Sequence, residues 1–416
     1  MAGSISRLTL CGAPFAKLPV GHAPKILAVT SVPTRVLTAS MTSKQYREPT
    51  EKPKPFPYET KTFRWYHGIF EDTLSRFDEN TKVIVVDGNI GAGKTTLVKT
   101  IAEEFDLRPY FEPSFDLIYV DDYGFDYRSI DHLVPESCRT CDIKKFYEDP
   151  HNLNVANMQI LMYRMRVEQY LQALAHVLNT GQGVVLERSA FSDMVFANTM
   201  NRFGYMSKPA LDTYHVLRNN TTPELLRPHL VIYLDVPSDI SLKRIKQRNI
   251  PYEVNSEVLT KDYLDEIDRQ YKFNYLKSIR DSSELLIYDW SSFGDTEVVV
   301  EDIERINFEK NLDDKHSPMF HDWKKPHEEA WTEYRYYVTT CKGQILGLFV
   351  LPASKVPELV VSGEDQLEYE WAVEKIQNRQ IYQKGYNPQL GDSVLFKMGY
   401  NKWHFMDTNT VQLSRL

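Results

Sequence analysis

One segment of the chain has the residue types and spacing of a phosphate-binding loop. Residues 88–95 read GNIGAGKT, which fits the pattern G-x-x-x-x-G-K-[ST], and only Asp87 separates them from the apolar run VIVV at 83–86. Glycines allow backbone conformations that a Cβ would block, so that successive amides and the start of a helix can surround phosphate oxygens. The pattern assigns the charge of Lys94 to the β and γ phosphates and the hydroxyl of Thr95 to Mg²⁺. We expect phosphate contacts from Gly88, Asn89, Ile90, Gly91, Ala92, Gly93, Lys94, Thr95 and Thr96.

Charged residues follow two other apolar runs. Glu112 lies in a Glu-Pro pair where the second strand of a parallel sheet would end, and a carboxylate there could accept the proton of an attacking hydroxyl. Glu187 and Arg188 follow the run GVVL and offer an acid for Mg²⁺ and a guanidinium for phosphate or a hydroxyl, or else a structural ion pair. The cationic segment KRIKQR at 243–248 could close over a nucleotide or be the solvated face of a helix.

The elements that position these residues alternate between strand and helix from about 82 to 308. Short apolar runs predict strands at 83–86, 183–187, 230–235 and 285–289. Hydrophobic periodicity predicts helices at 154–179, from 240 onward and at 260–280. This alternation predicts an α/β domain at 81–310, with a parallel sheet of the P-loop kinase type and helices on both faces.

The N-terminal region has a different composition. Before Glu48 there is no acidic residue, while Lys and Arg alternate with Ser, Thr, Ala and Leu, as is typical of an organelle-import leader. We expect a mitochondrial transit peptide within residues 1–45, with a disordered cytosolic tail as the alternative. Residues 46–80 carry four prolines between positions 49 and 57 and predict an extended arm. The aromatic residues expected to fix that arm to a surface are Phe63, Trp65, Tyr66 and Phe70.

The C-terminal region, residues 311–416, contains many Trp and Tyr residues within polar sequence. Such a segment either binds partner subunits or packs on the preceding domain. No apolar run is long enough to cross a bilayer, and a net charge of −8 argues against nucleic acid as a ligand. Four cysteines are too few for a disulfide scaffold. Cys138 and Cys141 form a lone C-x-x-C, which fits two ordinary thiols, a reversible disulfide or half of a metal site.

Taken together, the motifs resemble the deoxynucleoside kinase family over residues 82–308. The matching positions are the phosphate loop, the Glu-Pro pair, the YEDP stretch at 147–150, the ERS triplet at 187–189 and a lid with Arg244 and Arg248. The resemblance implies that Glu112 is the general base, Arg188 lies near the nucleoside 5′ end and Glu187 helps Thr95 to hold Mg²⁺. It also implies a nucleoside site formed by Tyr147, Gln159, Asp193 and Phe196. The implied ligand is a nucleotide or deoxynucleotide, with or without Mg²⁺.

Several positions depart from the family pattern. The last lid arginine is replaced by Ile250, and Leu117, Leu153 and Met194 stand where Trp, Trp and a basic residue are expected. Losing a cation where transition-state charge develops could reduce turnover by on the order of a thousandfold. The binding residues are therefore better preserved than the reacting ones.

With its leader, altered lid and aromatic tail, the chain most resembles the kinase-like accessory subunits of mitochondrial respiratory complex I. That resemblance implies a non-catalytic subunit on the matrix side of the inner membrane, bound to other subunits of the membrane arm. It implies no electron-transfer cofactor, in line with the absence of cysteine runs of iron–sulfur spacing. The alternative is an active mitochondrial deoxynucleoside kinase that transfers the γ-phosphate of ATP to a nucleoside 5′-hydroxyl.

Overall fold

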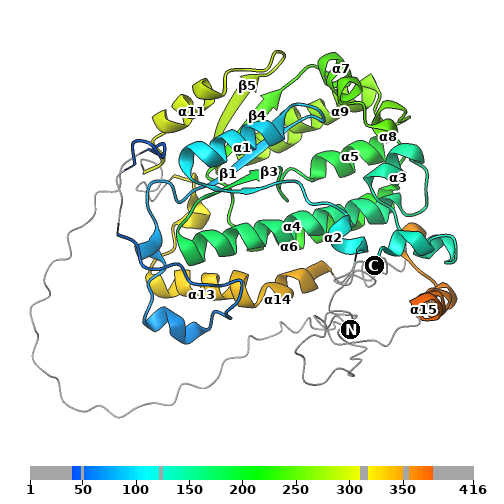
Figure 1. The fold of residues 1–416 in the computed structure, drawn as a ribbon, viewed down its shortest axis with the longest axis horizontal. Coiled ribbons are helices and arrows are strands. Elements are labelled where there is room, and N and C mark those ends of the chain that lie inside the picture. The colour runs from blue at the N-terminus through cyan, green and yellow to red at the C-terminus, as the bar shows by residue number, and fades with distance from the viewer. Residues whose placement is uncertain (1–39, 48–50, 121–124, 310–316, 350–355, 378–416) are drawn as a thin grey trace, which may run out of the picture. The chain divides into compact units, whose positions relative to one another are not determined.

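A central parallel sheet organises the computed structural model, which describes residues 40–47, 51–120, 125–309, 317–349 and 356–377. Five parallel strands lie in the order β2-β3-β1-β4-β5 (Figure 1). Their bounds are β1 (Val83–Gly88), β2 (Arg108–Tyr110), β3 (Val184–Glu187), β4 (Leu230–Asp235) and β5 (Glu284–Asp289). β1 is buried along its whole length, as the β-branched residues at 83–86 require of a central strand. The predicted α/β architecture is confirmed.

The register of the strands brings the chemically important residues to one edge. Val86 of β1 pairs with Glu187 of β3, and Gly88 pairs with Leu234 of β4. The phosphate loop therefore leaves β1 beside the carboxylate that ends β3. In parallel sheets ligands bind at this carboxyl edge.

Helices surround the sheet. In chain order they are α1 (Lys94–Phe105), α2 (Asp116–Tyr119), α3 (Ile143–Glu148), α4 (Val155–Thr180), α5 (Met194–Arg202), α6 (Lys208–Thr221), α7 (Ser238–Arg248), α8 (Pro251–Val254), α9 (Lys261–Gln270), α10 (Leu276–Ile279), α11 (Thr296–Arg305), α13 (Glu328–Thr340), α14 (Lys342–Leu346) and α15 (Gly363–Gln377). A π-helical turn, Tyr271–Tyr275, joins α9 to α10. α4 is almost entirely buried because α13 covers the side that a sheet-packed helix would leave exposed (Figure 1). None of the helices in the described residues combines the length and apolarity that a membrane-spanning helix needs.

The N-terminal arm is only partly extended. Residues 51–57 have no helix or strand, and the Phe56 amide donates a hydrogen bond to the Asn179 carbonyl, at the end of α4. Two 3-10 helices follow, η1 (Trp65–Ile69) and η2 (Leu74–Arg76). Of the four aromatic residues expected to fix the arm, only Phe63 is buried, and Trp65, Tyr66 and Phe70 face solvent. The expectation is therefore wrong for those three side chains.

The C-terminal region contributes to the main core. Eight of its apolar residues are buried there, namely Phe320, Trp323, Trp331, Val338, Ile345, Phe349, Val356 and Leu359. Residues 317–349 thus pack on the kinase-like domain, which is one of the two roles considered for this region. The residues beyond 377, and positions 1–39 of the expected leader, lie outside the described residues.

α15 covers a second, smaller cluster. Tyr127, Ile130, Val134 and Cys138 are buried there, and Tyr369 and Val373 of α15 pack against them. Cys138 and Cys141 are both buried, and neither forms a disulfide bond. Burial raises the pKa of the Cys141 thiol to about 12, so this thiol is protonated at neutral pH.

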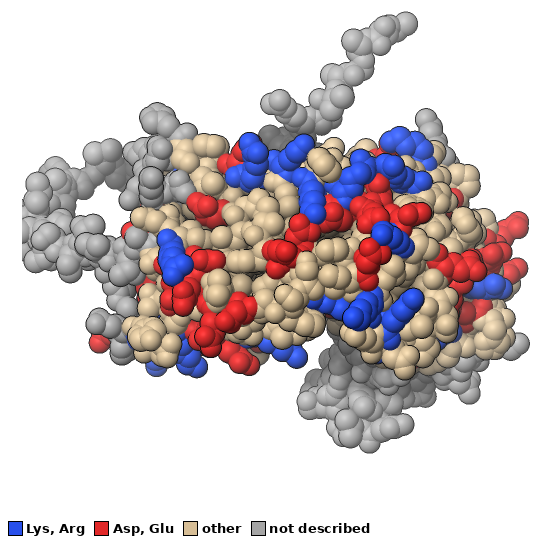
Figure 2. All heavy atoms as spheres, turned by 90° about the horizontal axis from the view of Figure 1, so that it is seen from above, with Lys and Arg blue, Asp and Glu red and all other residues tan. Residues whose placement is uncertain are grey.

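The surface seen from above carries charges of both signs. Lys and Arg side chains lie beside Asp and Glu side chains across this face (Figure 2). Exposed ion pairs of the chain include Lys261–Asp239, 2.8 Å apart. Surface pairs of this kind contribute little to stability.

Candidate functional site

The phosphate loop has the backbone conformation that its glycines predict. Gly91 and Gly93 adopt φ of 75° and 96°, in the left-handed region that L side chains rarely enter. A Cβ at Gly91 would also lie only 3.3 Å from the Ser241 carbonyl oxygen of α7. α1 begins at Lys94, within the last two residues of the loop motif, so the free amides of its first turn lie at the loop.

Lys94 is held inside the loop as a buried amine. Its Nζ donates a hydrogen bond to the Asn89 carbonyl oxygen at 2.9 Å. Burial, together with the nearby charge of Arg188, lowers the pKa of Lys94 to about 7. A polyphosphate in the loop would favour the charged ammonium and reverse this shift.

Thr95 and Glu187 lie together below the loop. The Thr95 hydroxyl donates to Glu187 Oε2 at 2.8 Å, and Glu187 is buried at the end of β3. Mg²⁺ in nucleotide sites is usually held by one or two protein oxygens, phosphate oxygens and water. A hydroxyl and a carboxylate at this position fit that requirement.

Glu112 is the centre of an ion-pair cluster. Arg188 Nη1 donates to its Oε2 at 2.5 Å, and Arg166 of α4 contacts its other oxygen. Burial alone would raise the pKa of Glu112, but the charges of Arg188 and Arg166 outweigh it and lower the pKa to about 2. Glu112 is therefore ionised at neutral pH, and each of its carboxylate oxygens has an arginine partner.

Asp193 is the centre of a second cluster and shares Arg166 with the first. It accepts hydrogen bonds from Gln159 Nε2 at 2.9 Å and from the Tyr214 hydroxyl at 2.7 Å, and Arg166 contacts its other oxygen. Burial raises its pKa, although Arg166 opposes the effect. Arg166 was not among the site residues predicted from the sequence. The sequence feature that could have indicated Arg166 is its position seven residues after Gln159, which places both side chains on one face of α4.

Phe196 joins the two clusters. The guanidinium carbons of Arg166 and Arg188 lie 5.0 and 4.9 Å from its ring centroid, within cation–π range. The predicted nucleoside residues Gln159, Asp193 and Phe196 are thus brought together. All three lie on or next to α4 and α5, which pack beside the carboxyl edge of the sheet.

Tyr147 approaches the site from α3. Its ring stacks with Tyr252 of α8 at 6.4 Å, and the Ser256 hydroxyl donates to its carbonyl oxygen. Burial raises the pKa of the Tyr147 hydroxyl, and the nearby carboxylates of Glu253 and Glu112 act in the same direction. Tyr147 thus carries a neutral hydroxyl close to Glu112 and Arg188.

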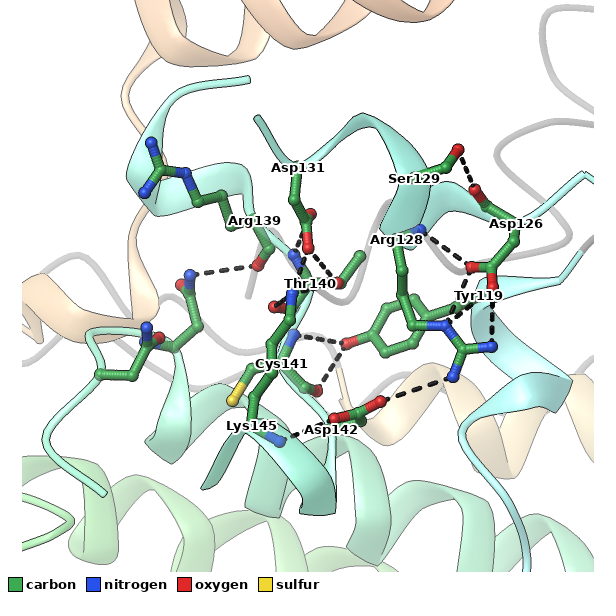
Figure 3. A network of polar contacts seen from close by, with 12 residues as sticks. Tyr119, Asp126, Arg128, Ser129, Asp131, Arg139, Thr140, Cys141, Asp142 and Lys145 are labelled. Atoms are coloured by element: carbon green, nitrogen blue, oxygen red, sulfur yellow. Dashed lines mark hydrogen bonds and ion pairs between the residues drawn. The ribbon is translucent and has the colours of Figure 1, made fainter. Parts of the chain in front are cut away.

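A polar network holds α3 in place (Figure 3). Arg128 bridges Asp116 of α2, at 2.6 Å, and Asp142, which caps the start of α3. The Tyr119 hydroxyl donates to the Cys141 carbonyl oxygen at 2.8 Å and accepts from the Cys141 amide. This network fixes the segment before α3 and hence the position of Tyr147.

The two lid arginines have partners within the protein. Arg244 donates to the Trp290 carbonyl oxygen at 2.7 Å and to that of Ala92 in the phosphate loop at 3.2 Å. Arg248 donates to Glu253 at 2.6 Å. Ile250 directly precedes α8 and carries no charge. Of the two lid arginines, it is Arg244 that contacts the loop.

The fold and the phosphate loop define a P-loop protein of the kinase-like class. Residues 84–324 match the model of the deoxynucleoside kinase family, and the chain belongs to that family. The resemblance inferred from the motifs is confirmed.

Individual relatives differ in how much of the chain they match. NADH dehydrogenase (ubiquinone) 1 alpha subcomplex subunit 10, mitochondrial, of Mus musculus is 34% identical over 329 residues, covering 78% of this chain and 86% of the mouse protein. Deoxyguanosine kinase of Dictyostelium discoideum is 27% identical over 237 residues, covering 57% of this chain and 74% of that enzyme. The structure of deoxyadenosine kinase from M. mycoides with bound dCTP matches at 21% identity and a TM-score of 0.40, covering 53% of this chain and 98% of that one.

Proposed function

We propose that this chain is an accessory subunit of mitochondrial complex I, NADH:ubiquinone oxidoreductase. The observation that carries the proposal is the 34% identity to the mouse complex I subunit over 86% of that subunit's length. The match to the mouse protein covers 78% of this chain, whereas the match to the Dictyostelium discoideum deoxyguanosine kinase covers 57%. It supports a mitochondrial location and other complex I subunits as partners.

We further propose a peripheral position on the matrix side of the inner membrane, against the membrane arm, after removal of a leader within residues 1–45. The acid-free N-terminal composition supports the leader. In this role the protein supports assembly or stability of the membrane arm and takes no part in electron transfer.

The chain retains a nucleotide pocket in this proposal. Phosphates would lie in the loop at 88–95 with the charge of Lys94, and the nucleoside would lie near Gln159 and Asp193. Thr95 and Glu187 would hold Mg²⁺, which when bound neutralises and orients phosphate oxygens. The close packing of these groups at the carboxyl edge supports this assignment.

Nucleoside kinase turnover is absent in this proposal. A carboxylate with a pKa of about 2, paired with both Arg166 and Arg188, is a weak proton acceptor at neutral pH. The lid also lacks the cation replaced by Ile250. Both features reduce the stabilisation of the transition state more than they reduce nucleotide affinity.

An active deoxynucleoside kinase remains the second candidate, favoured by the Thr95–Glu187 pair beside an intact loop and by the presence of Glu112. It predicts ATP- and Mg²⁺-dependent phosphorylation of deoxyguanosine or deoxycytidine by the purified chain. That activity would disappear in the variant Glu112→Gln.

One depletion and rescue experiment separates the two functions. Cells depleted of the chain should contain less assembled complex I on native gels, and expression of the wild-type chain should restore it. Glu112→Gln should restore it equally, provided that its thermal unfolding matches the wild type. Normal complex I after depletion would contradict the proposal. If a folded Glu112→Gln chain does not restore complex I, that result would favour the active deoxynucleoside kinase.

A further inference from the structure

α15 packs against a segment of the kinase-like domain, although α15 itself lies beyond residues 84–324, the part that matches the deoxynucleoside kinase family. Tyr369 and Val373 of this helix contact the smaller buried cluster, which is formed by side chains of residues 127–138. The segment between α2 and α3 contains these residues and includes η4 (Glu136–Cys138). The C-terminal region therefore supports the part of the chain that leads into α3.

Hydrogen bonds also join α15 to η4. The Ser137 hydroxyl donates to Asp365 Oδ2 at 2.5 Å, and the Cys138 thiol donates to the Asp365 carbonyl oxygen at 3.5 Å. A hydrogen bond that a carboxylate accepts is roughly twice as strong as one between neutral groups. Asp365 therefore fixes the position of η4 against the first turn of α15.

η4 is also attached to the start of α4. Asn154, the N-cap residue of α4, is buried, and its Nδ2 donates to the carbonyl oxygens of Glu136 at 2.8 Å and Arg139 at 3.1 Å. Gln159 lies on the second turn of the same helix. The position of η4 is therefore linked to the helix that carries a predicted nucleoside residue.

Residues 139–142 connect η4 directly to α3 (Figure 3). Asp131 accepts a hydrogen bond from the Thr140 amide at 2.8 Å, and Lys145 Nζ donates to the Thr140 carbonyl oxygen at 2.8 Å. Tyr147 follows Lys145 by two residues within α3. Because α3 has only six residues, its own hydrogen bonds are too few to stabilise it, and these contacts decide where it lies.

We propose that α15 positions Tyr147 for contact with a bound nucleoside, so that the C-terminal region completes the nucleotide pocket from outside the kinase-like domain. Asp365 and the apolar side of α15 hold η4, and residues 139–142 connect η4 to α3. Tyr147 is then the residue that binds the ligand, and Asp365 and Tyr369 are positioning residues.

This inference rests on the nucleotide pocket of the proposed function and adds that the affinity of this pocket depends on α15. The phosphate loop lies between β1 and α1 and takes no part in the contacts with α15 described above. Loss of those contacts should therefore weaken binding of the nucleoside part and leave binding of the phosphates unchanged. Because coupling between two sites is reciprocal, a bound nucleotide should also hold α15 more firmly on η4.

Titration calorimetry of the full-length chain with two ligands tests this inference. One ligand is whichever of deoxyguanosine triphosphate and deoxycytidine triphosphate the wild type binds more tightly, and the other is inorganic tripolyphosphate, which has no nucleoside part. In the variant Tyr369→Ala/Val373→Ala, affinity for the nucleotide should fall roughly tenfold, as for the loss of one hydrogen bond. Affinity for tripolyphosphate should not change.

Leu367→Ala/Trp371→Ala is the matched control on the same helix. Leu367 is 50% exposed and Trp371 is 64% exposed, so their loss leaves the contacts with η4 in place, and neither affinity should change. A second comparison concerns the hydrogen bond to Ser137. Asp365→Asn keeps an oxygen acceptor for this bond and should retain more nucleotide affinity than Asp365→Ala.

A double-mutant cycle shows whether α15 acts through Tyr147. Tyr147→Phe removes the hydroxyl but keeps the buried ring, and this change alone should weaken nucleotide binding. Adding Tyr369→Ala/Val373→Ala to Tyr147→Phe should cause little further loss, because both changes remove the same contact. Hydrogen exchange of the wild type should also show that the nucleotide slows exchange of the amides of α15.

Three results would overturn the inference. The first is a Tyr369→Ala/Val373→Ala chain that binds the nucleotide as tightly as the wild type does. The second is equal weakening of nucleotide and tripolyphosphate binding, and the third is a loss of nucleotide affinity that is as large in Tyr147→Phe as in the wild type. A wild-type chain that binds neither ligand would contradict the nucleotide pocket of the proposed function itself, and the inference with it.

Discussion

Lys94 should take up a proton when a triphosphate binds. In the free protein burial lowers its pKa to about 7, so the amine is largely uncharged above neutral pH. Phosphate oxygens in the loop favour the ammonium and raise this pKa again. Binding and protonation are therefore linked.

The size of the effect follows from that pKa. With a value of about 7, about one tenth of the free amines are charged at pH 8, so binding should take up roughly 0.9 proton. At pH 6 the amine is already charged, and uptake by this group should fall to about 0.1 proton. Affinity should fall about tenfold per pH unit above pH 7.

Titration calorimetry in buffers of different ionisation enthalpy measures this uptake directly. The ligand is a deoxynucleoside triphosphate with Mg²⁺, and Lys94→Met should bind more weakly without the linked proton. Lys82→Met is the matched control, because burial lowers the pKa of Lys82 to about 8 but this lysine lies beside Phe308, away from the loop. Uptake that persists in Lys94→Met, or that is as large at pH 6 as at pH 8, would refute the reasoning.

The same pKa shift predicts how the stability of the free protein depends on pH. The unfolded chain holds the Lys94 proton up to about pH 10.5, whereas the folded chain releases it near pH 7. Between these values the unfolded state binds more protons, so the free energy of unfolding should rise with pH. A shift of this size corresponds to roughly 5 kcal/mol against the charged form in the folded state. Lys94→Met should flatten the rise, as measured by urea unfolding across this window.

Three further predictions concern single contacts. Arg335→Met should lower the free energy of unfolding by about 3 kcal/mol, because it leaves the buried Asn179 oxygen without its donor. Urea unfolding measures this cost, and a much smaller value would contradict the described contact. Trp331→Ala should cost about 3–5 kcal/mol by opening a cavity between α13 and the arm, and an unchanged thermal midpoint would contradict the packing described for the C-terminal region. Glu187→Gln should abolish the Mg²⁺ dependence of nucleotide affinity in calorimetry but leave Mg²⁺-free binding intact, and retained Mg²⁺ dependence would remove Glu187 from the metal site.

Local patterns made the sheet and the loop predictable from sequence. The runs at 83–86 and 230–235 are apolar and bounded, and the glycine spacing at 88–93 fixes a loop without reference to distant residues. The long helix from 154 was predicted from its periodicity and is observed as α4.

Long-range contacts were not predictable. The role of Arg166 is recognisable only when α4 and α5 come together, so that Glu112 and Asp193 contact different nitrogens of its guanidinium. Arg335 reads as an ordinary polar residue of an exposed helix, yet it is buried against Glu71 and Phe63, far away in sequence. For the same reason, sequence could not decide which aromatic residues of the arm face inward.

The most direct test of the proposed function is the composition of purified complex I. Quantitative mass spectrometry of NADH:ubiquinone oxidoreductase, isolated from mitochondria of the organism that produces this chain, should find the chain in stoichiometric amounts with the core subunits. Its complete absence from intact, active enzyme would contradict the account.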